Sequence, residues 1–141
     1  MPSDTDAIAT LLFTYAERLD AGDLDGVAAL FAQATWRSPD RREPLNGAAA
    51  VRRAYDRVLL YDGKPSTRHV VTNVVVTVDA SRATARSTFT VFQALPDFPL
   101  QPIICGRYED AFVRDGDTWR FADRLIVPEL VVDLRRHLAP G

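Results

Sequence analysis

The chain has 141 residues, with 17 Lys and Arg against 19 Asp and Glu, and a formal net charge of -2. This length predicts one domain with a core of its own. The balanced charge argues against a protein that coats nucleic acid or an anionic membrane. One cysteine and two histidines exclude an internal disulfide and a zinc-finger or iron–sulfur framework. In an enzyme of this composition, acid/base chemistry must come from very few histidines, or from Asp, Glu and Tyr.

The N-terminal half is predicted to be helical. Apolar side chains recur at the helical period over residues 8–19, which indicates an amphipathic helix that ends at Gly22. Asp23 can cap a second, short helix because its side-chain oxygen satisfies a free backbone N–H. A loop with a short strand around Trp36 follows, and the helical period returns over residues 47–59.

The C-terminal half changes to the two-residue period of β-strands. Strands are expected over residues 67–78, 82–93, 103–114 and 119–127. The segment 96–102 contains three prolines and is expected to be a loop, because proline cannot donate a hydrogen bond to a strand ladder. The tail over residues 128–141 is expected to form a short helix.

Helices followed by antiparallel strands predict an α+β fold with the helices packed on one face of a sheet. A strongly curved sheet of this kind, closed by the helices, would leave a conical cavity. We expect a single domain over residues 1–141, with its core at about 5–127. The sequence shows neither the pattern of a signal peptide nor a run of about 18 apolar residues. A cytoplasmic protein without a membrane span is therefore expected.

Three segments together resemble the SnoaL-like domains of the nuclear transport factor 2-like superfamily. They are residues 15–23 with Leu30-Phe31, residues 67–73, and the hairpin over 106–121. The resemblance covers about residues 5–127. It implies a cone-shaped barrel, made of a strongly curved, mostly antiparallel sheet closed by three N-terminal helices. Such a domain is often a homodimer and has a pocket for a small hydrophobic or polycyclic molecule. The superfamily includes scytalone dehydratase, ketosteroid isomerase, limonene epoxide hydrolase, polyketide cyclases and dioxygenase small subunits, so the fold alone does not define the chemistry.

The resemblance also implies a set of catalytic residues. In the dehydratase relatives, a histidine at the start of a strand works with an aspartate from the end of the first helix, and these positions correspond to His69 and Asp20. An imidazole in an apolar pocket is a usable acid or base near neutral pH, and a carboxylate can orient it. Tyr15 could hold a substrate oxygen. The alternative is structural: a strand histidine bonded to backbone, a solvated aspartate and a core tyrosine.

Further residues are predicted to line the pocket. Strand alternation places Asn73 on the same face as His69, where its amide could bind a ligand or fix a neighbouring strand. The other candidates are aromatic and could equally be core residues: Tyr55, Tyr108, Trp36 and Phe89.

The sequence departs from the dehydratase pattern because the later strands contain no second histidine. His137 lies in the tail and could reach the pocket only if the tail folds back. An Asp-Arg-Asp set of the epoxide hydrolase kind could be drawn from Asp20, Arg107 and Asp110, although the spacing does not require it. We find no metal-ligand spacing and no phosphate-binding loop, so neither metal nor cofactor is expected.

These features predict cofactor-independent acid/base chemistry, such as dehydration, isomerisation or cyclisation next to a carbonyl. The alternative is a non-catalytic ligand-binding or assembly domain similar to the dioxygenase small subunits. Direct contact between the Asp20 carboxylate and the His69 imidazole, facing a cavity, would favour the enzyme.

Overall fold

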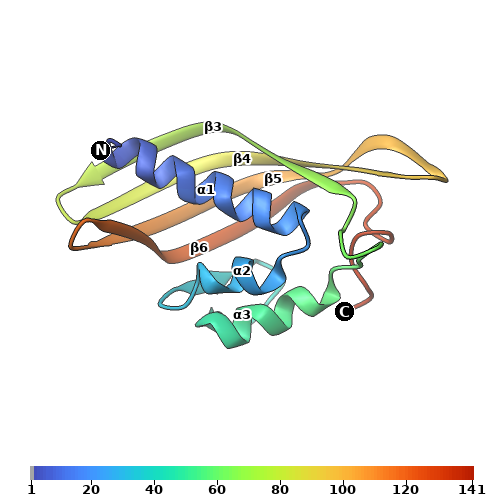
Figure 1. The fold of residues 1–141 in the computed structure, drawn as a ribbon, viewed down its shortest axis with the longest axis horizontal. Helices are drawn as coiled ribbons and strands as arrows, with labels where there is room; N and C mark the ends of the chain where they lie inside the picture. Colours follow the sequence, from blue (N-terminus) through green and yellow to red (C-terminus); the bar gives the residue numbers. More distant parts are fainter. Residues whose placement is uncertain (1) are drawn as a thin grey trace.

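The computed structural model describes residues 2–141 as helices packed against one face of a sheet (Figure 1). The helices are α1 (Asp4–Asp20), α2 (Leu24–Ala29) and α3 (Ala48–Ala54), and a 3-10 turn (Tyr55–Arg57) continues α3. The strands are β1 (Thr35–Arg37), β2 (Leu45–Asn46), β3 (Thr67–Asp79), β4 (Arg82–Leu95), β5 (Phe98–Asp115) and β6 (Thr118–Val131). The predicted α+β class is confirmed.

The strands form one sheet in the order β2-β1-β6-β5-β4-β3. Neighbouring strands are antiparallel except β1 and β6, which run parallel. The curled sheet is open, and the N-terminal helices cover it, with α1 lying across the long strands and α2 and α3 beyond β6 in Figure 1. This arrangement confirms the predicted cone. Among residues 2–141, no helix is long and apolar enough to cross a membrane.

Helix α1 positions the site because it carries one buried stripe towards the sheet. The Ser3 side chain caps its start by accepting from the Asp6 N–H. The stripe consists of Ile8, Leu12, Tyr15, Ala16 and Leu19, all buried. Gly22, at φ 79°, then turns the chain sharply away, so that Asp20 lies at the end of the helix and beside the start of β3.

Strand β3 does not keep its alternation, and the predicted face of Asn73 is wrong. The register with β4 shifts between Thr72 and Val75, where Asn73 adopts φ 54°. Such a β-bulge reverses the faces of the residues that follow it. Val74 therefore packs against the core and Asn73 is exposed, which takes Asn73 away from the face of His69.

Two predictions about irregular segments are also wrong. The segment 96–102 is not a loop, because β5 already begins at Phe98. Pro99 and Pro102 fit a strand here because β6 first pairs with β5 at Ile104, so the edge of β5 that faces β6 is unpaired at both prolines. The joined ends of β4 and β5 protrude from the sheet in Figure 1. The tail forms no helix. Strand β6 continues to Val131, and the chain then folds back as turns.

The third predicted helix is shorter than its apolar period. It ends as α-helix at Ala54, and a 3-10 turn carries Tyr55 to the cavity. The bridge between Val58 and Leu138 then joins this segment to the tail. The turn after α3 is therefore one wall of the site and the anchor of the C-terminal segment.

Gly106 on β5 has no space for a side chain. A Cβ there would overlap the Val127 carbonyl oxygen and lie 2.8 Å from Phe89 Cζ. We expect Gly106→Ala to lower the free energy of unfolding by about 1–3 kcal/mol, because the backbone of β6 or the ring must move. Urea unfolding measures this. Cys105→Ala, one residue away and without a clash, should cost less, and equal stability of the two variants would contradict the overlap.

Candidate active site

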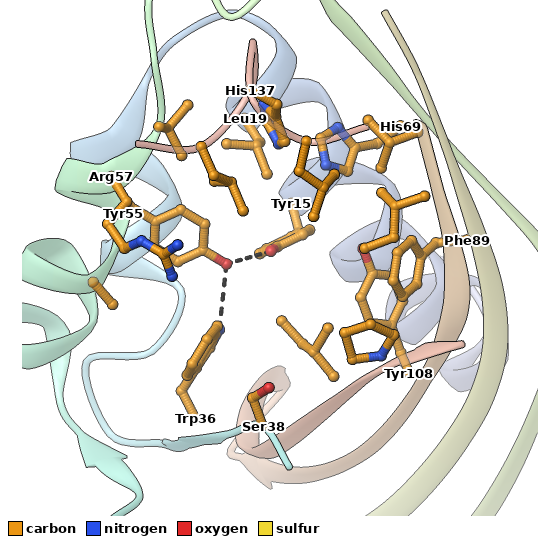
Figure 2. A pocket seen from close by; sticks show the side chains of 18 of the residues that line it. Tyr15, Leu19, Trp36, Ser38, Tyr55, Arg57, His69, Phe89, Tyr108 and His137 are labelled. Carbon is orange, nitrogen blue, oxygen red and sulfur yellow. Dashed lines mark hydrogen bonds between the residues drawn. The ribbon is translucent and has the colours of Figure 1, made fainter. Parts of the chain in front are cut away.

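A cavity of about 180 Å³ lies between the helices, the inner face of the sheet and the returning tail. Its walls are mainly apolar and aromatic, and Figure 2 shows the side chains arranged around an open centre. The predicted site residues that line it are His69, Tyr15, Tyr55, Tyr108, Trp36 and Phe89. Asp20 lies behind His69 rather than in the wall, and Asn73 is not part of the lining.

The Asp20 carboxylate is in direct contact with the His69 imidazole. Asp20 Oδ1 lies 2.6 Å from His69 Nδ1, and Oδ2 accepts the His69 backbone N–H at 2.8 Å. The Thr67 hydroxyl donates to Oδ1 at 2.9 Å. Only 5% of the His69 side chain and 13% of the Asp20 side chain are exposed. These contacts fix the carboxylate and engage Nδ1, which leaves His69 Nε2 available to a molecule in the cavity.

The tail supplies a second histidine to the cavity. The His137 ring lies with its centroid 6.0 Å from that of His69, and the residue is buried. The backbone holds it, since the Leu59 N–H donates to the His137 carbonyl at 2.8 Å and Gln93 Nε2 donates to the Arg136 carbonyl at 3.0 Å. His137 Nδ1 has no hydrogen-bond partner within residues 2–141. The condition left open by the sequence, that the tail folds back, is met.

Burial, and after it the charge of the neighbouring His69, lower the pKa of His137 from 6.5 to about 4, with Asp20 opposing both. Between pH 6.5 and about pH 4, His137 binds a proton in the unfolded chain but not in the folded protein, so the free energy of unfolding falls as the pH drops. Over this range we expect the free energy of unfolding of the wild type to fall by about 3 kcal/mol more than that of His137→Gln, which has no imidazole at this position. Urea unfolding of both proteins from pH 7 to pH 4 measures the difference. Parallel pH curves would contradict it.

Two phenols and an indole form a hydrogen-bonded chain on the helical side of the cavity. Trp36 Nε1 donates to the Tyr55 hydroxyl at 3.2 Å, and the Tyr55 and Tyr15 hydroxyls bond to each other (dashed lines in Figure 2). An indole can only donate, so the Tyr55 oxygen is an acceptor there and its own proton can point to Tyr15. The proton of Tyr15 is then free for a ligand.

Burial keeps these phenols protonated. It raises the pKa of Tyr15 and raises that of Tyr55 well above its ordinary value. A neutral phenol is a hydrogen-bond donor near neutral pH. Opposite them, Phe89 and Tyr108 stack with ring centroids 4.5 Å apart and form a flat wall. The cavity therefore combines a basic imidazole nitrogen, a hydroxyl donor and aromatic surfaces.

A fully buried ion pair behind this wall was missed by the sequence analysis. Arg124 Nε donates to Asp110 Oδ1 at 2.7 Å, and Nη2 donates to Oδ2 at 3.0 Å. Neither side chain has exposed surface. The available signal was strand alternation, because Asp110 lies between the inward-facing Tyr108 and Phe112 on β5.

The Asp-Arg-Asp set considered from the sequence, Asp20, Arg107 and Asp110, is not brought together in the structure. Asp110 is taken by Arg124, and Arg107 lies on the exposed face, where it pairs with Glu109 and Glu129. Asp20 is bound to His69 instead. Among residues 2–141, no group of three or more His, Cys, Asp or Glu side chains is placed to hold a metal ion.

A comparison with known protein families identifies a family for this chain. A model of the SnoaL-like domain matches residues 2–125. The chain belongs to the SnoaL-like domain family. This confirms the resemblance drawn from the three sequence segments.

Solved structures similar to this chain have different described roles. A Mycobacterium tuberculosis protein of unknown function is 25% identical, with a TM-score of 0.73 over 89% of this chain and 72% of that one. A proposed scytalone dehydratase from Novosphingobium aromaticivorans is 21% identical, with a TM-score of 0.73 over 97% and 92% of the two chains. The beta subunit of a proposed aromatic-ring-hydroxylating dioxygenase from the same organism is 19% identical, with a TM-score of 0.73 over 96% of each chain. At these identities the two latter similarities show the fold.

Proposed function

We propose that the chain is a cofactor-independent acid/base enzyme acting at a carbon next to a carbonyl group. The observation that carries this proposal is the 2.6 Å contact between Asp20 and the His69 imidazole at the wall of a cavity. A carboxylate bonded to Nδ1 orients the ring and stabilises the imidazolium that forms when Nε2 takes a proton. The similarity in fold to a proposed scytalone dehydratase agrees with this chemistry.

In the proposed reaction, His69 Nε2 removes a proton from the carbon next to the carbonyl. The electron pair of the broken C–H bond moves to the carbonyl oxygen, where the Tyr15 hydroxyl stabilises the developing negative charge. For dehydration, the carbonyl then reforms, the returning electron pair makes the C=C bond of the enone, and the C–O bond to the β-hydroxyl group breaks. The imidazolium gives its proton to the departing hydroxyl oxygen, and water leaves. For isomerisation, the proton returns to another carbon of the same molecule. Asp20 stays ionised throughout.

His137 has a different proposed role. It lies beside His69, and burial keeps it neutral near pH 7. A neutral second imidazole does not repel the imidazolium form of His69, and its ring nitrogens can bond to a departing hydroxyl group. The tail thereby supplies the second histidine that the strands lack.

The proposed substrate is a compact aromatic ketone with one or two rings. A cavity of about 180 Å³ lies below the usual range for sites of drug-sized ligands. Phe89, Tyr108 and Trp36 offer flat apolar surfaces.

We also propose that the working form is a homodimer, as the family resemblance implies. Light scattering of the purified protein tests this oligomeric state.

The test is formation of a conjugated enone from β-hydroxy derivatives of one- and two-ring aryl ketones, followed by ultraviolet absorbance. We expect turnover by the wild type and a loss of about 100-fold or more in Asp20→Asn, because the neutral amide no longer stabilises the imidazolium. Asp23→Asn is the matched control. Asp23 caps α2 through the Gly26 N–H, and asparagine caps a helix equally well. Equal rates in both variants would refute the role of Asp20.

A second candidate is a non-catalytic assembly domain. It is favoured by the similarity in fold to a dioxygenase beta subunit and by exposed apolar side chains at the end of β6, Leu130, Val131 and Val132. This function predicts no enone formation by the chain alone. It also predicts a stoichiometric complex with a larger oxygenase chain on co-purification.

A further inference from the structure

A buried cation lies directly behind the phenol chain. Asp110 on β5 and Arg124 on β6 are register partners, and two hydrogen bonds hold the guanidinium in place. The guanidinium carbon lies 4.4 Å from the ring centroid of Tyr15 and 3.8 Å from that of Tyr108. The guanidinium therefore lies against two rings that line the cavity, although Arg124 itself does not reach the cavity.

The fold alone gives little reason for this ion pair. Removing two charges from water costs several kcal/mol per ion, and apolar residues of similar volume are often as stable. Arg124 Nη1 also has no hydrogen-bond partner within residues 2–141. The fold thus retains a costly, incompletely satisfied cation at a position where its main neighbours are aromatic faces. Its position against Tyr15 suggests an effect on that phenol.

We propose that Arg124 is a positioning residue that makes Tyr15 the strongest hydrogen-bond donor among the cavity phenols. This proposal deepens the proposed function and rests on it for its catalytic meaning. A cation over an aromatic face stabilises the electron-rich form of the ring, and for a phenol that form is the phenolate. The low dielectric around a fully buried guanidinium strengthens the effect. Asp110 holds the guanidinium and cancels part of its charge.

The charges around Tyr15 agree with a lowering of its pKa by Arg124. Burial is the main cause that raises the pKa of Tyr15, and the charge of Arg124 is the largest opposing cause, ahead of the Tyr55 hydrogen bond and larger than the opposite effect of Asp110. Tyr55 is also buried but has no guanidinium on its ring, and its pKa is raised further. Tyr108 lies closer to Arg124, yet burial and the charge of an ionised Tyr15 hold its pKa well above the ordinary value.

The test compares two variants whose effects have opposite signs. In Asp110→Asn, Arg124 acts without its counter-charge, so Tyr15 should ionise at a lower pH than in the wild type. In the double variant Asp110→Asn/Arg124→Met both charges are absent, so Tyr15 should ionise at a higher pH, by about one unit or more. Protein labelled with fluorotyrosine, whose phenols ionise at lower pH than tyrosine, allows both shifts to be followed by fluorine NMR. The partly exposed Tyr61 is the internal control.

Shifts of Tyr15 in these opposite directions, with Tyr61 unchanged, support the proposal. An unchanged Tyr15 in either folded variant, or a shift of the same sign in both, overturns it. The shift of Tyr15 in either variant alone is enough to test the proposal. If one variant fails to fold, the other still gives the answer. The titration needs no substrate. A protein that shows the shifts but forms no enone would therefore refute the proposed function and leave the effect of Arg124 on Tyr15 in place.

Discussion

Replacing His69 with glutamine is expected to reduce the rate of enone formation by about 100- to 10,000-fold, the usual contribution of a positioned general acid or base. Glutamine keeps a polar side chain of similar size but cannot take up a proton near neutral pH. Asp20 still accepts the backbone N–H of residue 69 and the Thr67 hydroxyl, so the local fold should persist. The rate is measured at saturating ketone, and circular dichroism confirms folding.

The matched control for this variant is Arg68→Gln. Arg68 precedes His69 on β3, is exposed, and does not line the cavity. It should retain the wild-type rate. A rate in His69→Gln within about threefold of the wild type would contradict a proton-transfer role, since that difference is below 1 kcal/mol in activation free energy.

The largest expected effect on stability is that of Arg124→Met. The single change leaves the Asp110 carboxylate buried without its partner, which should cost about 3–5 kcal/mol of unfolding free energy. Asp110→Asn/Arg124→Met removes both charges and should recover most of the loss. Urea unfolding of the wild type, both single variants and the double variant gives the coupling energy.

A double variant whose loss equals the sum of the two single losses would show that the pair is not coupled. Arg120→Met is the surface control. Its pair with Asp115 is partly exposed, and pairs of this kind contribute about 0–1 kcal/mol. The contrast between the two arginines measures what burial adds to an ion pair in this fold.

Regular elements were predictable because their local patterns agree with their packing. The apolar stripe of α1 and the strict alternation of β4 both match the buried faces of the structure. The bulge in β3 was not predictable, since alternation alone gives no sign that Asn73 takes a positive φ. The prolines of β5 led to the wrong prediction of a loop for a related reason. Their acceptability depends on which edge of the strand is paired, and the local sequence does not contain that information.

The geometry of the candidate site was predictable only in part. Family resemblance indicated His69 and Asp20, and the structure places them in contact. The position of His137 depends on contacts between residues far apart in the chain, such as the bridge from Val58 to Leu138. Sequence spacing alone therefore could not predict whether the tail brings His137 to the cavity. The pair of Asp110 and Arg124 was missed because charged side chains are rarely fully buried, which makes them poor candidates for inward positions.

The most direct test of proton transfer by His69 is proton exchange at the carbon next to the carbonyl of a two-ring ketone such as 1-tetralone. The wild type and His69→Gln are incubated with the ketone in deuterium oxide, and proton NMR follows the loss of the signal. With the wild type we expect exchange at least about 100-fold faster than in buffer alone, and with His69→Gln we expect exchange at the buffer rate. Equal rates with the two proteins would contradict it.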